Sequence, residues 1–350
     1  MGVRRSSIVF GVVGIAAIVL SLLIWLVVVP SVTQLPANTD LKATYAGTGT
    51  LLNSSALASG DMKDVIVSNV PITVNREVKV TSVQGSTAIV SDSLAVHAGA
   101  ETIPSDHVYA LDRTTMEGVT PPAGIAVQPS VGALSSAFPL GPKASDSYQY
   151  YDSTTKDIAA IHYAGSATRD GRAVNIYKAT AAGPVKDPGV LRLLPPVLPK
   201  KTLVSLAPLL PAAKRAEITP ATLAALPDPV PLSYTGTTSV VAYVDQQTGI
   251  PIDESVSQQI VVNITAGTQT LSLIPVLVLD FHSTPASITT LANKAKTTGE
   301  ELTVIKVIAP VALLVLGVIL LAVAFLRRRR PGPAALSPVK SEDDPQPQST

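Results

Sequence analysis

PITVNREVKVTSV, residues 71–83, carries the pattern that decides the fold class. Val74, Val78 and Val80 share one parity, whereas Asn75, Glu77 and Lys79 share the other. Successive side chains of a strand point to opposite faces of its sheet, so this alternation predicts one buried face and one wet face. Such a strand is typical of an antiparallel sheet.

Segments of the same kind follow along the chain, each rich in Val, Ile and Thr and separated from the next by Gly or Pro. At least eight such candidates with few helical stretches predict a mainly β fold, built on a curved antiparallel sheet or half-barrel. The expected strands are residues 65–70, 71–83, 86–98, 107–113, 149–153, 158–165, 173–180, 239–245, 254–265 and 270–283.

Residues 184–231 differ from the rest, because 11 prolines in 48 residues exclude a central strand or a long helix. Leucine keeps returning between the prolines, which a solvated linker would not need. Two interpretations stay open for this Pro/Leu-rich excursion: an irregular segment packed on the sheet, or a lid at the mouth of an apolar cavity. Within it, Thr219 is expected to cap a short helix that begins at Pro220. A second helix is expected to begin at Ser287.

Two apolar runs bracket these strands, at residues 8–29 and 305–326. Each holds about 20 residues, enough for a helix to cross roughly 30 Å of hydrocarbon. Arginines lie on the outer side of both runs, so the positive-inside rule places both termini in the cytoplasm. The predicted protein is a two-pass protein of the plasma membrane with residues 31–304 outside. Residues 1–7 form its cytoplasmic N-terminus and 327–350 a disordered cytoplasmic tail.

The first run has one alternative interpretation, a cleaved signal peptide. Signal h-regions are shorter, and this run contains Trp25 and ends without a small-x-small cleavage site. We therefore expect an uncleaved anchor. Cleavage would still leave the β-domain outside the membrane.

Composition excludes several functions. The chain contains no cysteine, which removes disulfides, thiol nucleophiles and thiolate metal ligands. Residues 32–304 carry 18 Lys and Arg against 22 Asp and Glu, and this acidic balance argues against nucleic acid as a partner. The four histidines lack the spacing of a zinc site, so neither a metal nor a cofactor is expected.

No catalytic motif is convincing, so we expect the protein not to be an enzyme and to have no catalytic residues. Ser153 and Lys156 have the S-x-x-K spacing of acyl enzymes, yet they follow a strand-like segment instead of opening a helix. Nucleotide-binding glycine loops and G-x-S-x-G are absent from the sequence.

Two segments repeat one turn pattern. VYALDRTTMEGV and VAYVDQQTGIPI each place an Asp after a strand and then a Thr-containing turn. Asp112 and Asp245 are expected to accept local backbone hydrogen bonds, and Gly249 to supply the positive φ of a tight turn. The pair is either two ordinary hairpins or a duplicated sheet unit.

With AFPL at residues 137–140 and YQYYD at 148–152, these segments resemble an actinobacterial family of uncharacterised, double-anchored membrane proteins, the porin-PorA-like family. The resemblance covers nearly the whole β-domain and carries no known catalytic residues. Its name implies a porin, but both apolar runs lack a polar stripe. The strand with an Asp-x-x-Thr-Gly turn is also similar to half-barrel carriers of bacterial envelopes, which hold acyl chains.

We interpret the protein as a non-enzymatic envelope protein that binds or presents a lipid or glycolipid in a cavity of its β-domain. Strands such as residues 260–265 are expected to line that cavity. One alternative is a scaffold that docks an envelope protein partner, which would be an enzyme or a transporter. The other is a channel. The candidate ligand contacts are Tyr148, Tyr150, Leu193, Leu194 and Leu198.

Overall fold

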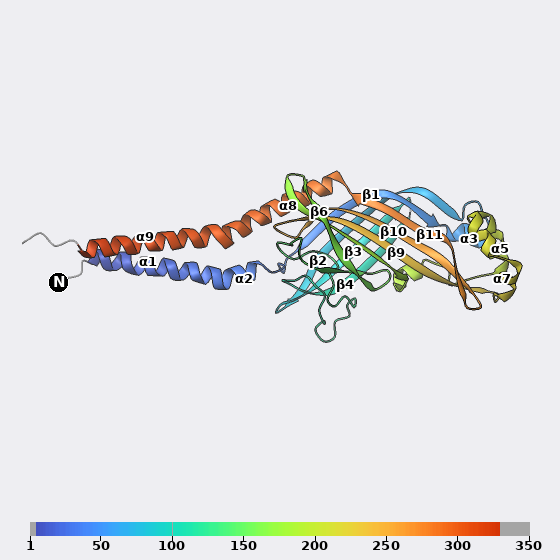
Figure 1. The fold of residues 1–350 in the computed structure, drawn as a ribbon, viewed down its shortest axis with the longest axis horizontal. Helices are drawn as coiled ribbons and strands as arrows, with labels where there is room; N and C mark the ends of the chain where they lie inside the picture. The colour runs from blue at the N-terminus through green and yellow to red at the C-terminus, as the bar shows by residue number, and fades with distance from the viewer. Residues whose placement is uncertain (1–4, 100, 330–350) are drawn as a thin grey trace, which may run out of the picture. The chain divides into compact units, whose positions relative to one another are not determined.

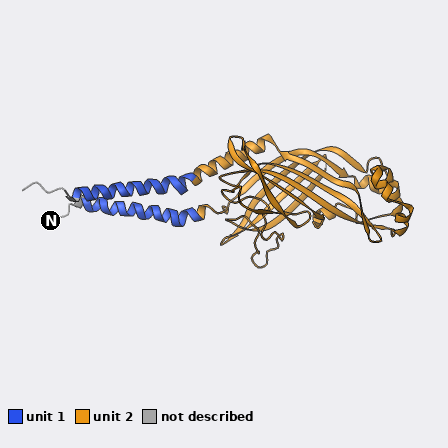
Figure 2. Ribbon diagram, in the orientation of Figure 1, with its two compact units in different colours: residues 1–30, 303–350 blue, residues 31–302 orange. Residues whose placement is uncertain are grey.

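The computed structural model describes residues 5–99 and 101–329, which form two compact units (Figures 1 and 2). Unit 1 combines residues 1–30 with 303–350, and unit 2 is residues 31–302. The predicted β-domain, 31–304, exceeds unit 2 by two residues at its C-terminal end. Most of the predicted disordered tail lies outside the described residues.

Unit 2 is built on a sheet that curls into a half-barrel, as the sequence predicts (Figure 1). All its strand pairs are antiparallel among the described residues, and the order is β4-β3-β2-β1-β11-β10-β9-β7-β6-β5, with β8 paired to β9. The strands are β1 Asp40–Leu52, β2 Ile66–Gln84, β3 Thr87–Ala98, β4 Glu101–Asp112, β5 Tyr148–Asp152, β6 Asp157–Arg169, β7 Arg172–Pro184, β8 Val197–Leu198, β9 Val230–Asp245, β10 Pro251–Ala266 and β11 Gln269–Ser283.

The strand β1 was not predicted, because glycine lowers strand propensity and β1 contains Gly47 and Gly49. The structure gives the reason for Gly47. A Cβ at this position would collide with the carbonyl oxygen of Asp280 on β11. Glycine therefore permits β1 and β11 to approach closely at the centre of the curled sheet.

The two strands predicted at 65–70 and 71–83 are one strand, β2. The joint lies at Asn69, whose φ of 57° places it in the left-handed region that Asn tolerates. Here the register with β1 shifts between Gly49 and Leu51, which absorbs an extra residue as a bulge. The bulge bends β2 without ending it.

One turn occurs three times among the described residues, after β4, β5 and β9. In each copy an Asp side chain accepts a hydrogen bond from the backbone N–H of the Thr three residues on: Asp112, Asp152 and Asp245. The sequence predicts the turns at Asp112 and Asp245 but not the one at Asp152. The residue after each Thr has a positive φ and donates its N–H to the Asp carbonyl oxygen: Met116 (62°), Lys156 (56°) and Gly249 (71°).

Asp245 holds its turn against β7 through Arg172, with Nε–Oδ2 and Nη2–Oδ1 distances of 2.8 and 3.1 Å. Burial acts to raise the pKa of Asp245, but hydrogen bonds from Arg172 and Thr248 outweigh it and lower the pKa below its usual value. A depressed pKa in the folded state means that the pair stabilises the fold above the unfolded pKa, about 3.9, and stops doing so as the pH falls below it.

We therefore expect Asp245→Asn to lower the free energy of unfolding by about 3 kcal/mol at pH 7, because Arg172 loses its charged partner. The difference from wild type should shrink below about pH 4. Urea unfolding between pH 7 and pH 3.5 measures both. Asp280→Asn, at an exposed position on β11, is the matched control, and an equal loss in the two variants would contradict the prediction.

One buried hydrophobic cluster of unit 2 lies at the end of the sheet where the excursion packs. Ile260, Val262 and Ile264 of β10 are buried there against leucines of the excursion. Leucine and isoleucine from two layers interdigitate at this end and leave only a small cavity of about 40 Å³, which Val262 borders. None of residues 260–265 lines the large cavity of the domain, so the expectation that this strand lines the ligand cavity is wrong.

The excursion folds into short helices, with α4 Pro188–Leu191, α5 Lys200–Leu206, α6 Ala212–Glu217 and α7 Pro220–Ala225. As predicted, Thr219 caps α7, its side chain accepting a hydrogen bond from Thr222 N, and Pro220 is the first helical residue. Prolines keep each helix to two turns or fewer. Several leucines of the excursion are nevertheless buried in the core, so the excursion is packed on the sheet: Leu194, Leu198, Leu203, Leu210 and Leu226.

Unit 2 has two further α-helices among its described residues: α3 Ser54–Ser59 connects β1 to β2, and α8 Pro285–Thr303 follows β11. The predicted start of α8 at Ser287 is two residues late. Thr284 caps the helix by accepting a hydrogen bond from Ser287 N, and Pro285 takes the first position. Ser287 Oγ instead accepts a hydrogen bond from Thr44 N on β1.

Unit 1 is a pair of helices. The first comprises α1 Arg5–Leu23, a π-helical turn Ile24–Val28 and α2 Val29–Val32; the second continues through a π-helical turn Val304–Ile308 into α9 Ala309–Arg329. The helices Ser7–Val32 and Pro285–Arg327 are long and apolar enough to cross a membrane.

Small and polar residues hold α1 against α9. A Cβ on Gly14 would lie 2.9 Å from the carbonyl oxygen of Gly317, so glycine allows the two backbones to touch. Ser7 and Ser21 donate hydrogen bonds to carbonyl oxygens of the opposite helix, at 2.7 and 2.8 Å. These hydroxyl groups are used between the helices and do not form a water-lined stripe.

Candidate functional site

A cavity of about 540 Å³ lies on the concave face of the sheet in unit 2. Its walls come from every strand of the sheet except β8, from the loop between β4 and β5, and from the start of the excursion. The volume falls within the range of small-molecule sites, roughly 300–1,000 Å³. The cavity exists because small side chains, such as Ala179, Thr238 and Ala242, lie opposite the covering loop.

The loop between β4 and β5 closes the curled sheet on this side. Gly118 bridges to both Leu111 and Val131, and Leu134 bridges to Tyr150. A Cβ on Gly118 would collide with the carbonyl oxygen of Ser130, so glycine lets the loop fold back on itself. The loop therefore connects the two edge strands, β4 and β5, and covers the cavity.

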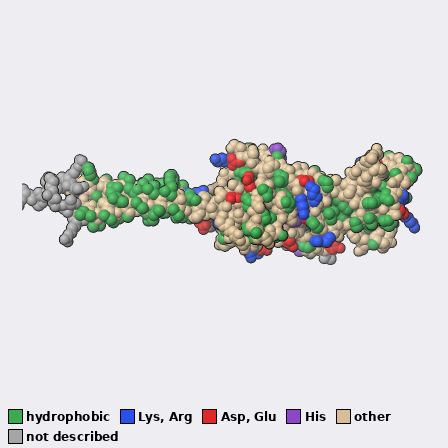
Figure 3. Space-filling view, turned by 90° about the horizontal axis from the view of Figure 1, so that it is seen from below, with side chains coloured by type: hydrophobic (Ala, Val, Ile, Leu, Met, Phe, Trp, Pro, Cys, Tyr) green, Lys and Arg blue, Asp and Glu red, His purple; other side chains and the backbone are tan. Residues whose placement is uncertain are grey.

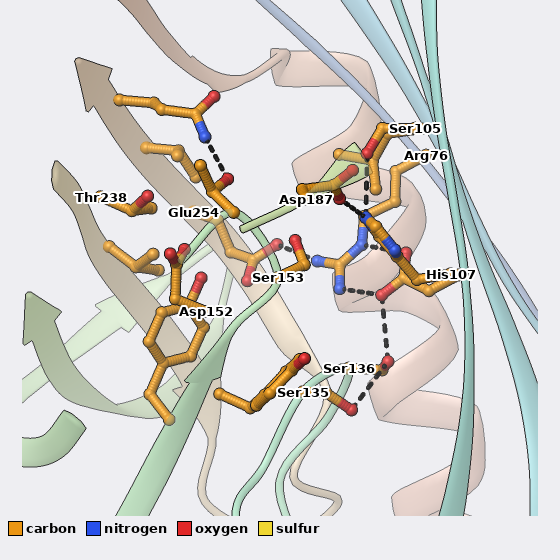
Figure 4. Close-up of a pocket in the computed structure, with 18 of the residues that line it drawn as sticks. Arg76, Ser105, His107, Ser135, Ser136, Asp152, Ser153, Asp187, Thr238 and Glu254 are labelled. Atoms are coloured by element: carbon orange, nitrogen blue, oxygen red, sulfur yellow. Dashed lines mark hydrogen bonds and ion pairs between the residues drawn. The ribbon is translucent and has the colours of Figure 1, made fainter. Parts of the chain in front are cut away.

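Three charged side chains meet inside the cavity: Arg76 of β2, Asp92 of β3 and Glu254 of β10. Arg76 forms two hydrogen bonds with Asp92, at 2.9 and 2.7 Å, and its Nη1 lies 3.3 Å from Glu254 Oε2. In Figure 4, Arg76 and Glu254 point toward each other. Their strands are three intervals apart in the sheet, roughly 14 Å if it were flat, so the curl brings these groups together.

Hydroxyl groups complete this charged cluster. Tyr45 donates to Glu254 Oε2 at 2.6 Å, and Ser136 of the loop donates to Asp92 Oδ2 at 3.0 Å. Burial acts to lower the pKa of Arg76, but the adjacent Asp92 and Glu254 outweigh it, and the pKa lies well above its usual value. Burial raises the pKa of Tyr45, with Glu254 adding to the effect. Arg76 therefore stays charged and Tyr45 stays neutral at physiological pH.

A second polar group joins β4 to the start of the excursion. His107 Nε2 lies 3.4 Å from Asp187 Oδ2, and both side chains are about 7% exposed. Gln128 of the loop connects His107 to Tyr151, with contacts of 3.1 and 3.0 Å. Asp187 also caps α4, so this contact fixes the excursion against the opposite edge of the sheet.

Two hydroxyl groups in the cavity wall have no hydrogen-bond partner within the described part of the chain. Thr238 Oγ1 is buried and unpaired, and the Tyr150 hydroxyl makes no hydrogen bond there. Burial, followed by the charge of Asp152, raises the pKa of Tyr150, which keeps this hydroxyl a donor. The Thr238 oxygen is enclosed by protein, whereas Tyr150 is only partly buried, so the Tyr150 hydroxyl is the one available to a bound molecule.

The remaining wall is apolar. Leu94, Val96, Ile103, Val256 and Phe281 are among the side chains that line it. A molecule in the cavity would meet hydrocarbon on one side and hydroxyl and carboxyl groups on the other. Such a surface suits an amphipathic ligand.

The predicted ligand contacts separate into two groups. Tyr150 and Leu193 line the cavity. Tyr148 does not: it is buried with Phe138 and Tyr177, and its hydroxyl donates to Asp146. Leu194 and Leu198 are buried in the packed end of the core. In a proline-rich segment the sequence does not predict which leucines point inward, because such a segment has no fixed periodicity.

The charged cluster was not predicted, although the sequence contains a signal for it. Arg76 has the same parity as Val74 and Val78, and Asp92 the same parity as Val90 and Val96. A charge on the buried parity of a strand is unusual unless it is paired. Glu254 likewise has the same parity as Val256 on β10. Three such charges in separate strands would have predicted a polar cluster inside the sheet.

The arrangement favours binding over a covalent reaction. Ser153 lines the cavity, but Lys156 lies in the β5–β6 turn with a φ of 56°, so the S-x-x-K pair is not on a helix. Within residues 5–99 and 101–329, no three His, Asp or Glu side chains are grouped to hold a metal ion.

Comparison with known proteins gives one family. A model of the family described as Porin PorA matches residues 6–326, which is nearly the whole chain. No curated protein matches. Among solved structures, an acyl-CoA thioesterase II TesB2 from Mycobacterium marinum shares 12% identity over 70% of this chain and 80% of that one. Its TM-score of 0.13 carries no argument about fold or function.

Proposed function

The chain belongs to the PorA porin family. We propose that it is a membrane-anchored envelope protein that binds a lipid or glycolipid in the cavity of unit 2. One observation carries the proposal: a 540 Å³ cavity with an apolar wall facing a hydroxyl- and carboxyl-rich wall. Both apolar helices would span the plasma membrane, with the termini in the cytoplasm and unit 2 outside.

The cavity volume limits how much of a lipid is bound. A volume of 540 Å³ lies in the range of small-molecule sites, so it suits one acyl chain or one compact headgroup. Each buried CH₂ contributes about 0.8 kcal/mol, so the affinity should rise with the length of the acyl segment that the cavity buries.

The polar wall favours a headgroup with hydroxyl groups over a phosphate. Five acidic side chains line the cavity against Arg76, Lys178 and Arg192. Two of the five, Asp92 and Glu254, already occupy the Arg76 guanidinium. A phosphate would meet more carboxylates than free cations, whereas sugar or polyol hydroxyls can donate to carboxylates and pair with the Tyr150 hydroxyl.

Native mass spectrometry of the purified domain, residues 31–303, tests the proposal, combined with extraction of any copurifying lipid. We expect one lipid per domain, with a hydroxyl-rich headgroup. A domain that is free of lipid and takes up none of the added envelope lipids would overturn the proposal and favour a scaffold that docks an envelope enzyme or transporter.

The family match favours a second candidate, a channel. A channel predicts unitary conductance when the full chain is reconstituted in planar bilayers. The hydrogen bonds of Ser7 and Ser21 across the helix pair leave little polar surface in the described helices to line a pore within one chain. Conductance by this protein would therefore require several copies.

A further inference from the structure

The excursion presents an exposed apolar and basic surface, here called the excursion surface, formed by Val197, Lys200, Lys201, Val204 and Leu209. The three apolar side chains are 45%, 48% and 40% exposed. Their neighbours Leu198, Leu203 and Leu210 are buried in the core and hold the short helices in place. The outward residues are therefore not required for the packing of the excursion.

Charge is unevenly distributed in unit 2. The excursion, residues 184–231, carries six Lys and Arg against three Asp and Glu, whereas the rest of residues 32–304 carries 12 against 19. The Lys200 and Lys201 ammonium groups have no acidic partner among the described residues, whereas Lys186 and Lys214 pair with Asp157 and Glu217. The excursion surface is thus a basic region on an acidic domain.

The excursion lies at one end of the curled sheet, over the start of β9 and the end of β10. The chain enters and leaves unit 2 at the other end, where Thr44 contacts α8. A strand the length of β9, 16 residues, spans roughly 50 Å. Figure 3 shows apolar side chains gathered at the excursion end with basic side chains at the margin. The start of the same segment lines the cavity through Val190 and Leu193.

We propose that the excursion surface docks on an anionic lipid surface. Exposed aliphatic side chains beside unpaired lysines suit insertion between headgroups with electrostatic attraction to anionic lipids. A protein partner is less consistent with the composition, because residues 184–231 contain no Trp, Tyr, Phe or Met, the residues in which protein interfaces are enriched. Docking itself is independent of the cavity, but its use in lipid delivery depends on the proposed function.

The test uses the full chain held in nanodiscs of neutral lipid and measures co-flotation with added vesicles. The vesicles contain either phosphatidylcholine alone or phosphatidylcholine with about one third phosphatidylglycerol. Two double variants remove the surface, Val204→Asp with Leu209→Asp and Lys200→Glu with Lys201→Glu. A matched double variant, Ile158→Asp with Lys79→Glu, changes an exposed apolar residue and an exposed lysine on the sheet.

We expect the wild type and the matched variant to bind anionic vesicles, and each excursion variant to bind at least tenfold more weakly. Loss of two lysines, at about 1 kcal/mol each, corresponds to about 30-fold. In the other variant, the aspartates oppose insertion of the two aliphatic positions between headgroups. Binding should fall as salt rises. Equal binding by all variants, or no binding to either vesicle, would overturn the inference. Lipid in the cavity, measured by native mass spectrometry on the same variants, reports separately on the proposed function.

Discussion

Replacing Arg76 by methionine is expected to lower the free energy of unfolding by about 3–5 kcal/mol. The substitution leaves the buried Asp92 and the partly buried Glu254 without their cation, and uncompensated buried charges are strongly destabilising. Asp92 is 3% exposed, so water replaces little of the lost interaction. Urea unfolding of the purified domain at neutral pH measures the loss.

A combined variant separates charge from packing. Adding Asp92→Asn and Glu254→Gln to Arg76→Met removes the two uncompensated charges, and we expect it to recover more than half of the lost stability. If Arg76→Met alone unfolds within about 0.5 kcal/mol of wild type, the charged cluster contributes little to the fold.

Filling the cavity is expected to abolish ligand binding. Ala179 lies in the cavity wall on β7, and Ala179→Trp would place an indole in the space that we assign to the lipid. Because the side chain enters an existing cavity, the overpacking penalty should remain below about 3 kcal/mol. Lipid occupancy measured by native mass spectrometry should fall at least tenfold.

The neighbouring residue gives the control for this prediction. Thr180 follows Ala179 on β7, is exposed, and contacts Ser239 on the opposite face. Thr180→Trp should retain the bound lipid, since its side chain points away from the cavity. Equal occupancy in the two variants would show that the lipid is bound elsewhere.

The long strands explain how one sheet forms both a core and a cavity. Along β10, Ile260 and Ile264 are packed at one end, and Val256 and Glu254 border the cavity at the other. Large aliphatic residues meet the excursion at the packed end, whereas Ala179 and Ala242 leave space at the other. Stability and binding therefore depend on different parts of the same strands, and cavity variants can be folded.

The sequence by itself determined the features that depend on local patterns. Alternation in residues 71–83 predicted a half-buried antiparallel sheet, and the apolar runs predicted two helices able to span a membrane. Thr219 and Pro220 identified a helix start. Each of these signals involves residues that are neighbours in the chain, so it can be read without knowing how the strands pair.

Only the tertiary structure decided where the cavity lies and which residues line it. Arg76 and Glu254 are 178 residues apart, and no local pattern relates them. They meet because Gly47 lets β1 approach β11 closely and the sheet curls over three strand intervals. The orientation of Leu193 toward the cavity and of Leu194 and Leu198 toward the core likewise depends on how the proline-rich excursion packs, since contacts between distant segments fix a chain that has no periodicity of its own.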